Sequence, residues 1–278
     1  MTGPKRAYIL VTILFLSLVT SSFAAWGRPG LLWGFMLGLF FYWLTFFFAN
    51  DQLINLFNAT PVEGQDPWGL LPRLRQLSQR ARLPMPKAYI FDSQTMNTYA
   101  IARNHKNSSI VLSSGLVSGL SGAELSAVLA HQVACIKSLE TVNFSVSSFF
   151  MNIILFFKSN QSADIGYSQN PGWGADFFRL FVCLTMPLLV MIRRVAVSRK
   201  CYYSLDQRAV ELTQDPTTYV ETLWKLQSYA RARRLQISPV IAHLFMVNPL
   251  TNRGLGRYFQ AQPQLEDRIR RLVGYYPI

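Results

Sequence analysis

The distribution of hydrophobic residues predicts a membrane anchor at the start of the chain. Residues 7–25 and 31–49 are two runs without any charged residue, separated by the short link 26–30. Each run is long enough for a helix to cross the hydrocarbon core of a bilayer, so we predict a transmembrane helical hairpin. The alternative for the first run is a signal peptide cleaved near Ala25, where small residues precede the position.

Two later hydrophobic runs predict a third and a fourth membrane segment. They cover residues 142–157 and 177–192, and the second contains Arg179 and Pro187, which favours a kinked or partly interfacial helix. Basic residues flank the first and the fourth segments: Lys5, Arg6, Arg193, Arg194, Arg199 and Lys200. By the positive-inside rule both termini are expected to be cytoplasmic, as four spans require.

The region between the hairpin and the third segment has the pattern of a small folded α/β part. Apolar residues recur at helical spacing over 68–82, and the short apolar runs 88–91 and 109–113 predict strands. Ser121 precedes Glu124 at capping-box spacing, so a helix is expected to begin there and continue directly into the third hydrophobic segment.

Helices are also expected near the C-terminus, over 220–234 and 266–274. Composition supports the membrane interpretation of the whole chain. Half of the 278 residues are hydrophobic and the net charge is +13, which basic cytoplasmic loops explain, whereas no nucleic-acid-binding module is recognisable. The three cysteines form no C-x-x-C pair, so neither a disulfide framework nor an all-cysteine zinc site is indicated.

The helix after Ser121 carries the sequence His131-Gln132-Val133-Ala134-Cys135. An H-E-x-x-H helix places two histidines on one face to hold zinc and supplies a glutamate as general base. Here Gln132 occupies the base position and Cys135 the second ligand position. A glutamine has no titratable carboxylate, so it cannot accept a proton from a metal-bound water.

On these motifs the chain resembles the HtpX-like membrane zinc metallopeptidases, over nearly its whole length. The family's S-R-x-x-E-x-x-A-D motif resembles residues 198–206, where Tyr202 stands at the glutamate ligand position. Its T-H-P-x-x-x-x-R-I motif resembles residues 261–269, where Gln262 replaces the histidine. The resemblance implies that Asp206 and Glu140 support the former site from behind, as second-shell or structural groups.

The resemblance also implies a peptide-binding edge strand beside the active-site helix. Asn97 and Tyr99 match the family's N-A-[FY]-A-like segment, and Ile110, Val111, Leu112 and Ser113 match the strand that pairs with an extended substrate.

We therefore predict a mainly α fold with a small mixed β-sheet, a gluzincin-like peptidase domain on a four-helix transmembrane anchor. The expected parts are the hairpin 1–50, the cytoplasmic α/β part 51–140, the membrane segments 141–193 and the cytoplasmic helical part 194–278.

The expected function is that of an integral membrane pseudopeptidase in the bacterial inner membrane. It would lack an intact catalytic residue and zinc, with weak residual metal binding at His131 and Cys135 as an open alternative. Its expected partners are membrane lipid and a membrane protein or polypeptide segment, not nucleic acid, in a role in membrane-protein quality control. Two alternatives are an active peptidase whose metal site uses His131, Cys135 and Asp206, and a purely structural subunit of a membrane complex.

Overall fold

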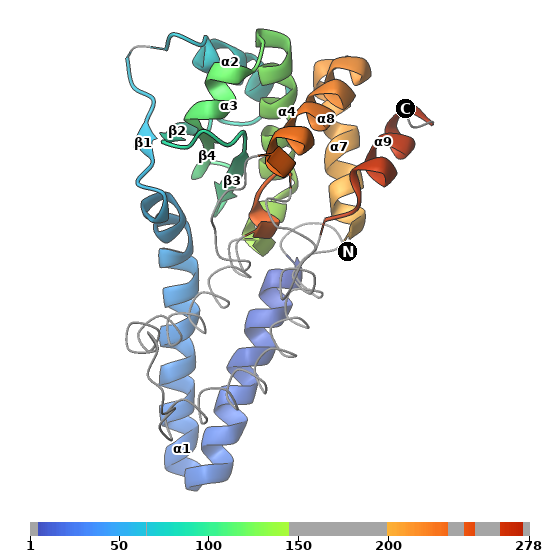
Figure 1. The fold of residues 1–278 in the computed structure, drawn as a ribbon. Helices are drawn as coiled ribbons and strands as arrows, with labels where there is room; N and C mark the ends of the chain where they lie inside the picture. The colour runs from blue at the N-terminus through green and yellow to red at the C-terminus, as the bar shows by residue number, and fades with distance from the viewer. Residues whose placement is uncertain (1–4, 65, 145–198, 233–241, 248–261, 275–278) are drawn as a thin grey trace, which may run out of the picture.

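The computed structural model describes residues 5–64, 66–144, 199–232, 242–247 and 262–274. The first element, α1 (Lys5–Leu56), folds back on itself at Gly27, whose φ of 63° and ψ of −140° interrupt the helix. Figure 1 shows its two arms side by side, projecting from the rest of the molecule. Within the described residues, the stretch Val11–Trp43 of this element is the candidate membrane span by length and composition.

The two arms pack closely through glycines on the second arm. A Cβ atom at Gly30 would lie 2.0 Å from the Ser22 carbonyl oxygen, and one at Gly38 would lie 2.6 Å from the Phe15 ring. Gly34, between them, is buried in the same way. Small residues allow membrane helices to approach this closely. The predicted five-residue link 26–30 is wrong in extent, because only Gly27 leaves the helical conformation.

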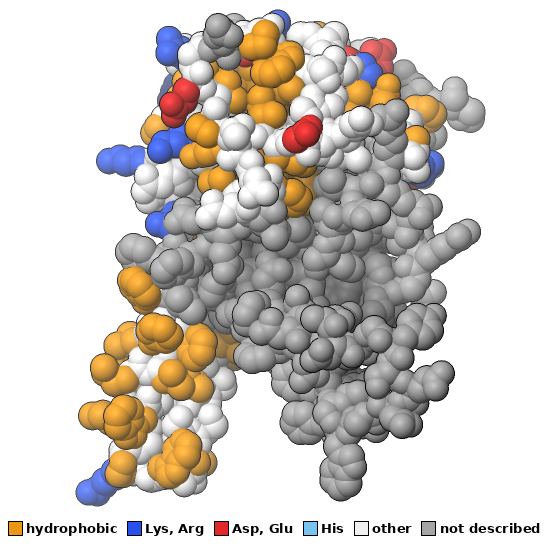
Figure 2. Space-filling view, turned by 60° about the vertical axis from the view of Figure 1, so that its left-hand side comes forward, with side chains coloured by type: hydrophobic (Ala, Val, Ile, Leu, Met, Phe, Trp, Pro, Cys, Tyr) orange, Lys and Arg blue, Asp and Glu red, His pale blue; other side chains and the backbone are white. Residues whose placement is uncertain are grey.

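The outer surface of the hairpin is apolar. Figure 2 shows hydrophobic side chains over its visible face, whereas most of the visible charged side chains lie on the part above it. This distribution fits contact with lipid along the hairpin. The predicted third and fourth segments lie almost wholly outside the described residues.

A four-stranded mixed sheet follows the hairpin, in the order β1-β2-β4-β3. The strands β1 and β2 are antiparallel, β2 and β4 parallel, and β3 and β4 antiparallel. Their bounds are β1 (Thr60–Pro61), β2 (Lys87–Phe91), β3 (Thr98–Ala102) and β4 (Ser108–Ser113). The expected small mixed sheet is confirmed. The expectation that Ile110–Ser113 forms an edge is wrong, because β4 is hydrogen-bonded to a strand on each side, which leaves β3 at the edge.

Helices complete a single apolar core around the sheet, with α4 in contact with α7, α2, α8 and β3. Their bounds are α2 (Leu70–Arg80), α3 (Ser114–Gly119), α4 (Gly122–Ser138), α7 (Arg199–Thr213), α8 (Pro216–Ala232), a 3-10 turn (Ala242–Leu244) and α9 (Leu265–Val273). The mainly helical class is confirmed.

The central helix α4 does not continue directly into the third hydrophobic segment. Leu139 adopts the left-handed conformation, with φ 54° and ψ 21°, and ends α4 before residues 140–144 resume helical structure. The expected continuous helix is therefore wrong at this one residue. A leucine gives no sequence signal for such a cap, which glycine usually forms.

Candidate functional site

The capping box that the sequence predicts fixes the start of α4. The Ser121 hydroxyl accepts a hydrogen bond from the Glu124 amide, and the Ser121 amide donates to the Glu124 carboxylate at 2.7 Å. Glu124 also forms an ion pair with Lys225 of α8, with Nζ 2.9 Å from Oε2. The cap and the ion pair thus connect the first turn of α4 to α8, and His131, further along α4, is buried.

A buried chain of polar groups connects His131 to the C-terminal helix. Nδ1 of His131 lies 2.9 Å from the Tyr219 hydroxyl, which donates to Asp206 Oδ1 at 2.7 Å. Arg268 donates from Nε to Asp206 Oδ2 at 2.8 Å and from Nη2 to Oδ1 at 2.6 Å. Since the Tyr219 hydroxyl donates to the carboxylate, its oxygen accepts from His131, which assigns the imidazole proton to Nδ1.

Burial and neighbouring charges determine which of the groups in this hydrogen-bond network are ionised. Burial alone would raise the pKa of Asp206, but the Arg268 guanidinium more than offsets burial and holds that pKa well below its usual range. Burial lowers the pKa of His131 although the nearby Asp206 carboxylate opposes the shift, so the imidazole is neutral at pH 7. Burial, the Asp206 charge and the Glu140 charge raise the pKa of the Cys135 thiol, so it stays protonated.

The other two replaced positions bind the chain's own backbone. The Tyr202 hydroxyl donates to the His243 carbonyl at 3.0 Å, and the Tyr202 ring stacks on Phe144 at 5.9 Å between centroids. The Gln262 side-chain amide donates to the Phe245 carbonyl. Both side chains are therefore engaged in holding the segment that contains residues 243–245.

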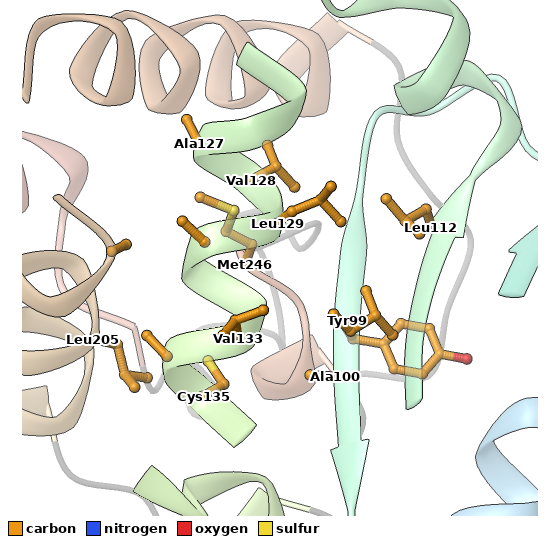
Figure 3. Packing of buried hydrophobic residues seen from close by; sticks show 14 of the residues in the cluster. Tyr99, Ala100, Leu112, Ala127, Val128, Leu129, Val133, Cys135, Leu205 and Met246 are labelled. Atoms are coloured by element: carbon orange, nitrogen blue, oxygen red, sulfur yellow. The ribbon is translucent and has the colours of Figure 1, made fainter. Parts of the chain in front are cut away.

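The remaining positions of the former motif are buried. Gln132 is 1% exposed, and its Nε2 has no hydrogen-bond partner within the described part of the chain. Cys135 lies among apolar side chains of the core, in the same cluster as Leu205 and Met246 (Figure 3). Glu140 accepts a hydrogen bond from Asn143 at 2.7 Å.

The structure brings some expected site residues together and separates others. Oδ1 of Asp206 lies 3.4 Å from Nδ1 of His131, whereas Tyr202 and Gln262 bond to carbonyls of another segment. Sequence reasoning missed the roles of Tyr219 and Arg268. Arg268 carries a signal, since it is the arginine of the motif at 261–269, but a tyrosine within an amphipathic helix carries none.

Zinc is the metal that the resemblance implies. A catalytic zinc site requires three deprotonated protein ligands and an open position. No group of three His, Cys, Asp or Glu side chains gathers around one point in the described ranges. The Cys135 thiol is held protonated, and both oxygens of Asp206 accept hydrogen bonds from Arg268. The side chains in the described part of the chain therefore do not fit a catalytic zinc ion.

The sequence profile of peptidase family M48 matches residues 70–275. A "Protease HtpX homolog" of Pelotomaculum thermopropionicum is 29% identical over 272 residues, covering 96% of this chain and 97% of the relative. A "Protease HtpX homolog" of Campylobacter curvus is 29% identical over 273 residues, covering 96% and 95% respectively.

One solved structure supports the fold. The "Crystal Structure of S. mikatae Ste24p" superposes with a TM-score of 0.54 at 21% identity. The match covers 93% of this chain and 62% of that chain, so the present chain spans less than two thirds of its length. At this identity the likeness concerns the fold alone. The profile match over most of the chain and the two full-length relatives place it in peptidase family M48, among the HtpX-like membrane metallopeptidases.

Proposed function

We propose that this chain is a non-catalytic member of its family, an integral membrane pseudopeptidase of the bacterial inner membrane with both termini in the cytoplasm. It binds a polypeptide segment or a membrane-protein partner and serves as an adaptor, regulator or assembly factor in membrane-protein quality control. The observation that carries the proposal is the use of the replaced side chains. Tyr202 and Gln262, at the positions of a ligand and a late histidine, bond to the chain's own carbonyls.

The loss of chemistry follows from the same residues. With glutamine at position 132 the general base of the motif is missing, and loss of a general base alone costs about 10²- to 10⁴-fold in rate. The alternative metal site of His131, Cys135 and Asp206 is disfavoured, because Arg268 and Tyr219 occupy the Asp206 oxygens. A carboxylate released from Arg268 to bind metal would leave a buried, unpaired guanidinium.

The test is the metal content of the purified chain, with a variant that restores the missing groups. We expect no stoichiometric zinc in the native chain by elemental analysis. The triple variant Gln132→Glu, Cys135→His, Tyr202→Glu is expected to take up about one zinc per chain, because positions 131 and 135 lie one helical turn apart on α4, which packs against α7.

Gln132→Glu alone is the matched control, and it is expected to gain neither zinc nor hydrolysis of an unfolded protein substrate. One zinc per native chain, lost on His131→Ala, would contradict the proposal. If crosslinking in native membranes finds no polypeptide partner and the chain instead co-purifies as a fixed subunit, the purely structural alternative gains the support.

A further inference from the structure

A pocket of about 210 Å³ lies where α2 meets the start of α4 and the turn between α7 and α8. Figure 1 shows these elements at the end of the molecule away from the hairpin turn. Two arginines of α2 line the pocket together with amide, hydroxyl and carboxylate groups, among them Arg73, Gln76, Arg80, Ser126 and Asp215. It is called the α2 pocket below.

Two glycines and two carbonyl groups fix the position of the Arg73 guanidinium. Its Nη1 donates to the Trp68 carbonyl at 2.9 Å and to the Gly69 carbonyl at 2.6 Å. A Cβ atom at Gly69 would lie 2.5 Å from Nη1, and a Cβ atom at Gly122 would overlap Nη2. The guanidinium therefore occupies a space that exists only because neither of these two residues has a side chain.

This position is electrostatically unfavourable for a cation and favourable for an anion. Gly69 precedes the first residue of α2, and Gly122 is the first residue of α4. The Arg73 guanidinium thus lies at the positive ends of two helix dipoles, where negatively charged groups are stabilised and positive ones are not. An anionic ligand at this point would be attracted by the arginine and by both helix ends.

The carboxylates near the α2 pocket already have other partners. Asp66 and Asp215 cap α2 and α8 by accepting hydrogen bonds from backbone amides at 2.7 and 3.0 Å. Glu124 is paired with Lys225 of α8. None of the ion pairs within the described residues includes Arg73 or Arg80. Both arginines therefore keep their charge available for a ligand from outside the chain.

The spacing of the two arginines favours an extended ligand. Arg73 and Arg80 are seven residues apart on α2, so they share one face of the helix and lie about 10 Å apart along its axis. Arg73 points back to residues 68–69, whereas Arg80 donates to the Leu212 carbonyl at 3.0 Å. An extended polypeptide rises about 3.3 Å per residue, so about four residues span the two arginines. Two carboxylates of one segment fit this separation better than a single phosphate group.

We propose that the α2 pocket binds an acidic segment of a partner polypeptide, with one carboxylate at Arg73 and a second at Arg80. The inference rests on the proposed function and names the chemistry of the partner. The planar guanidinium of arginine donates two parallel hydrogen bonds to a carboxylate. The net charge of +13 attracts acidic partners at long range, and the pocket determines where they bind. Because the pocket lies away from the candidate membrane span, its ligand comes from water rather than from lipid headgroups.

The first test measures binding of fluorescently labelled hexaglutamate to the full chain in nanodiscs of zwitterionic lipid. Arg73→Gln is expected to raise the Kd at least about fivefold, because a hydrogen-bonded charge pair is lost. Arg270→Gln is the matched control, since it removes the same charge from an exposed position on α9, and it is expected to change the Kd less than about twofold. Equal losses in the two variants would show that only the overall charge attracts the peptide, and would overturn the proposal.

The second test moves Arg73 without changing any charge. In Gly122→Ala the new methyl group displaces the flexible end of the Arg73 side chain, while alanine is well tolerated in the first turn of α4. The variant is expected to keep the native circular dichroism spectrum and to bind hexaglutamate about three- to tenfold more weakly. An unchanged Kd in the folded variant would contradict the proposal, because the peptide would then not depend on the position of the guanidinium.

Competition distinguishes a carboxylate site from a phosphate site. Inorganic phosphate, added at constant ionic strength and at the concentration of the peptide, is expected to leave hexaglutamate bound. Displacement of the peptide by phosphate in the native chain, absent in Arg73→Gln, would assign the pocket to phosphate and overturn the polypeptide proposal. These readouts are independent of metal. Zinc in the native chain would contradict the proposed function and leave the peptide result unchanged, whereas failure of hexaglutamate to bind would leave the metal result unchanged.

Discussion

At the scale of single residues, the most consequential feature is a buried charge pair. Asp206 and Arg268 are almost fully buried and make two hydrogen bonds to each other, while Tyr219 and the Met246 carbonyl satisfy further polar atoms. A buried pair of this kind contributes little net stability when intact, but it is costly to break, because the remaining charge has no solvent and no partner.

Asp206→Asn is therefore expected to lower the free energy of unfolding by about 3–5 kcal/mol, since it leaves the Arg268 guanidinium buried and unpaired. The double variant Asp206→Leu, Arg268→Met removes both charges and is expected to lose less than the single variant. Chemical denaturation in detergent measures both. A double variant that is less stable than Asp206→Asn would show that the pair is a net source of stability.

At the scale of elements, the sequence predicts those helix and strand positions that depend only on residues close to one another along the chain. The capping box at Ser121 and Glu124 identifies the start of α4, and the β-branched run at 109–113 identifies β4. The position of β4 inside the sheet could not be predicted, because an apolar run shows that a strand is buried but not which strands flank it.

The same limit applies to the candidate site. The contact between His131 and Tyr219 joins residues that are 88 positions apart, and that between Asp206 and Arg268 spans 62 positions. Helical periodicity indicates which face of α8 is buried but not the hydrogen bond that its tyrosine makes. The family motifs identify the replaced positions in the sequence. The hydrogen-bond partners of Tyr202 and Gln262 are known only from the structure.

The hairpin supports a prediction at this scale. Gly34→Leu is expected to destabilise the protein by about 1–3 kcal/mol, because even a Cβ atom there would lie 2.8 Å from Ser22 Cβ and force the arms apart. The matched control is Leu32→Ala on the exposed face of the same arm, which is expected to change stability little. Thermal unfolding in nanodiscs compares the two. A Gly34→Leu variant as stable as the native chain would show that the arms do not pack as described.

At the scale of the whole molecule, the hairpin turn and the globular part lie at opposite ends (Figure 1). Trp26 at the turn is 70% exposed, and Trp224 on α8 is 47% exposed. If the proposed topology holds, cysteines placed at these two positions face opposite sides of the membrane.

In a variant without native cysteines, Trp26→Cys is expected to react with an impermeant thiol reagent added from outside, and Trp224→Cys only after the membrane is opened. The permeabilised sample is the control for reactivity of both. Labelling of Trp224→Cys in intact cells would reverse the topology, and loss of residues 7–25 from the mature chain would identify that run as a cleaved signal.

The buried hydrogen-bond network from His131 to Arg268 also constrains the order in which the protein folds during synthesis. His131, Tyr219, Asp206 and Arg268 belong to four helices, and the arginine is the last of them to leave the ribosome. Until it emerges, the carboxylate has no countercharge and cannot be buried at an acceptable free energy. The helices around α4 therefore pack completely only after residue 268 has been synthesised. The N-terminal hairpin is translated long before that point, so we expect membrane insertion to precede completion of the core. A chain truncated before residue 268 is expected to stay incompletely folded and to be bound by chaperones or proteases.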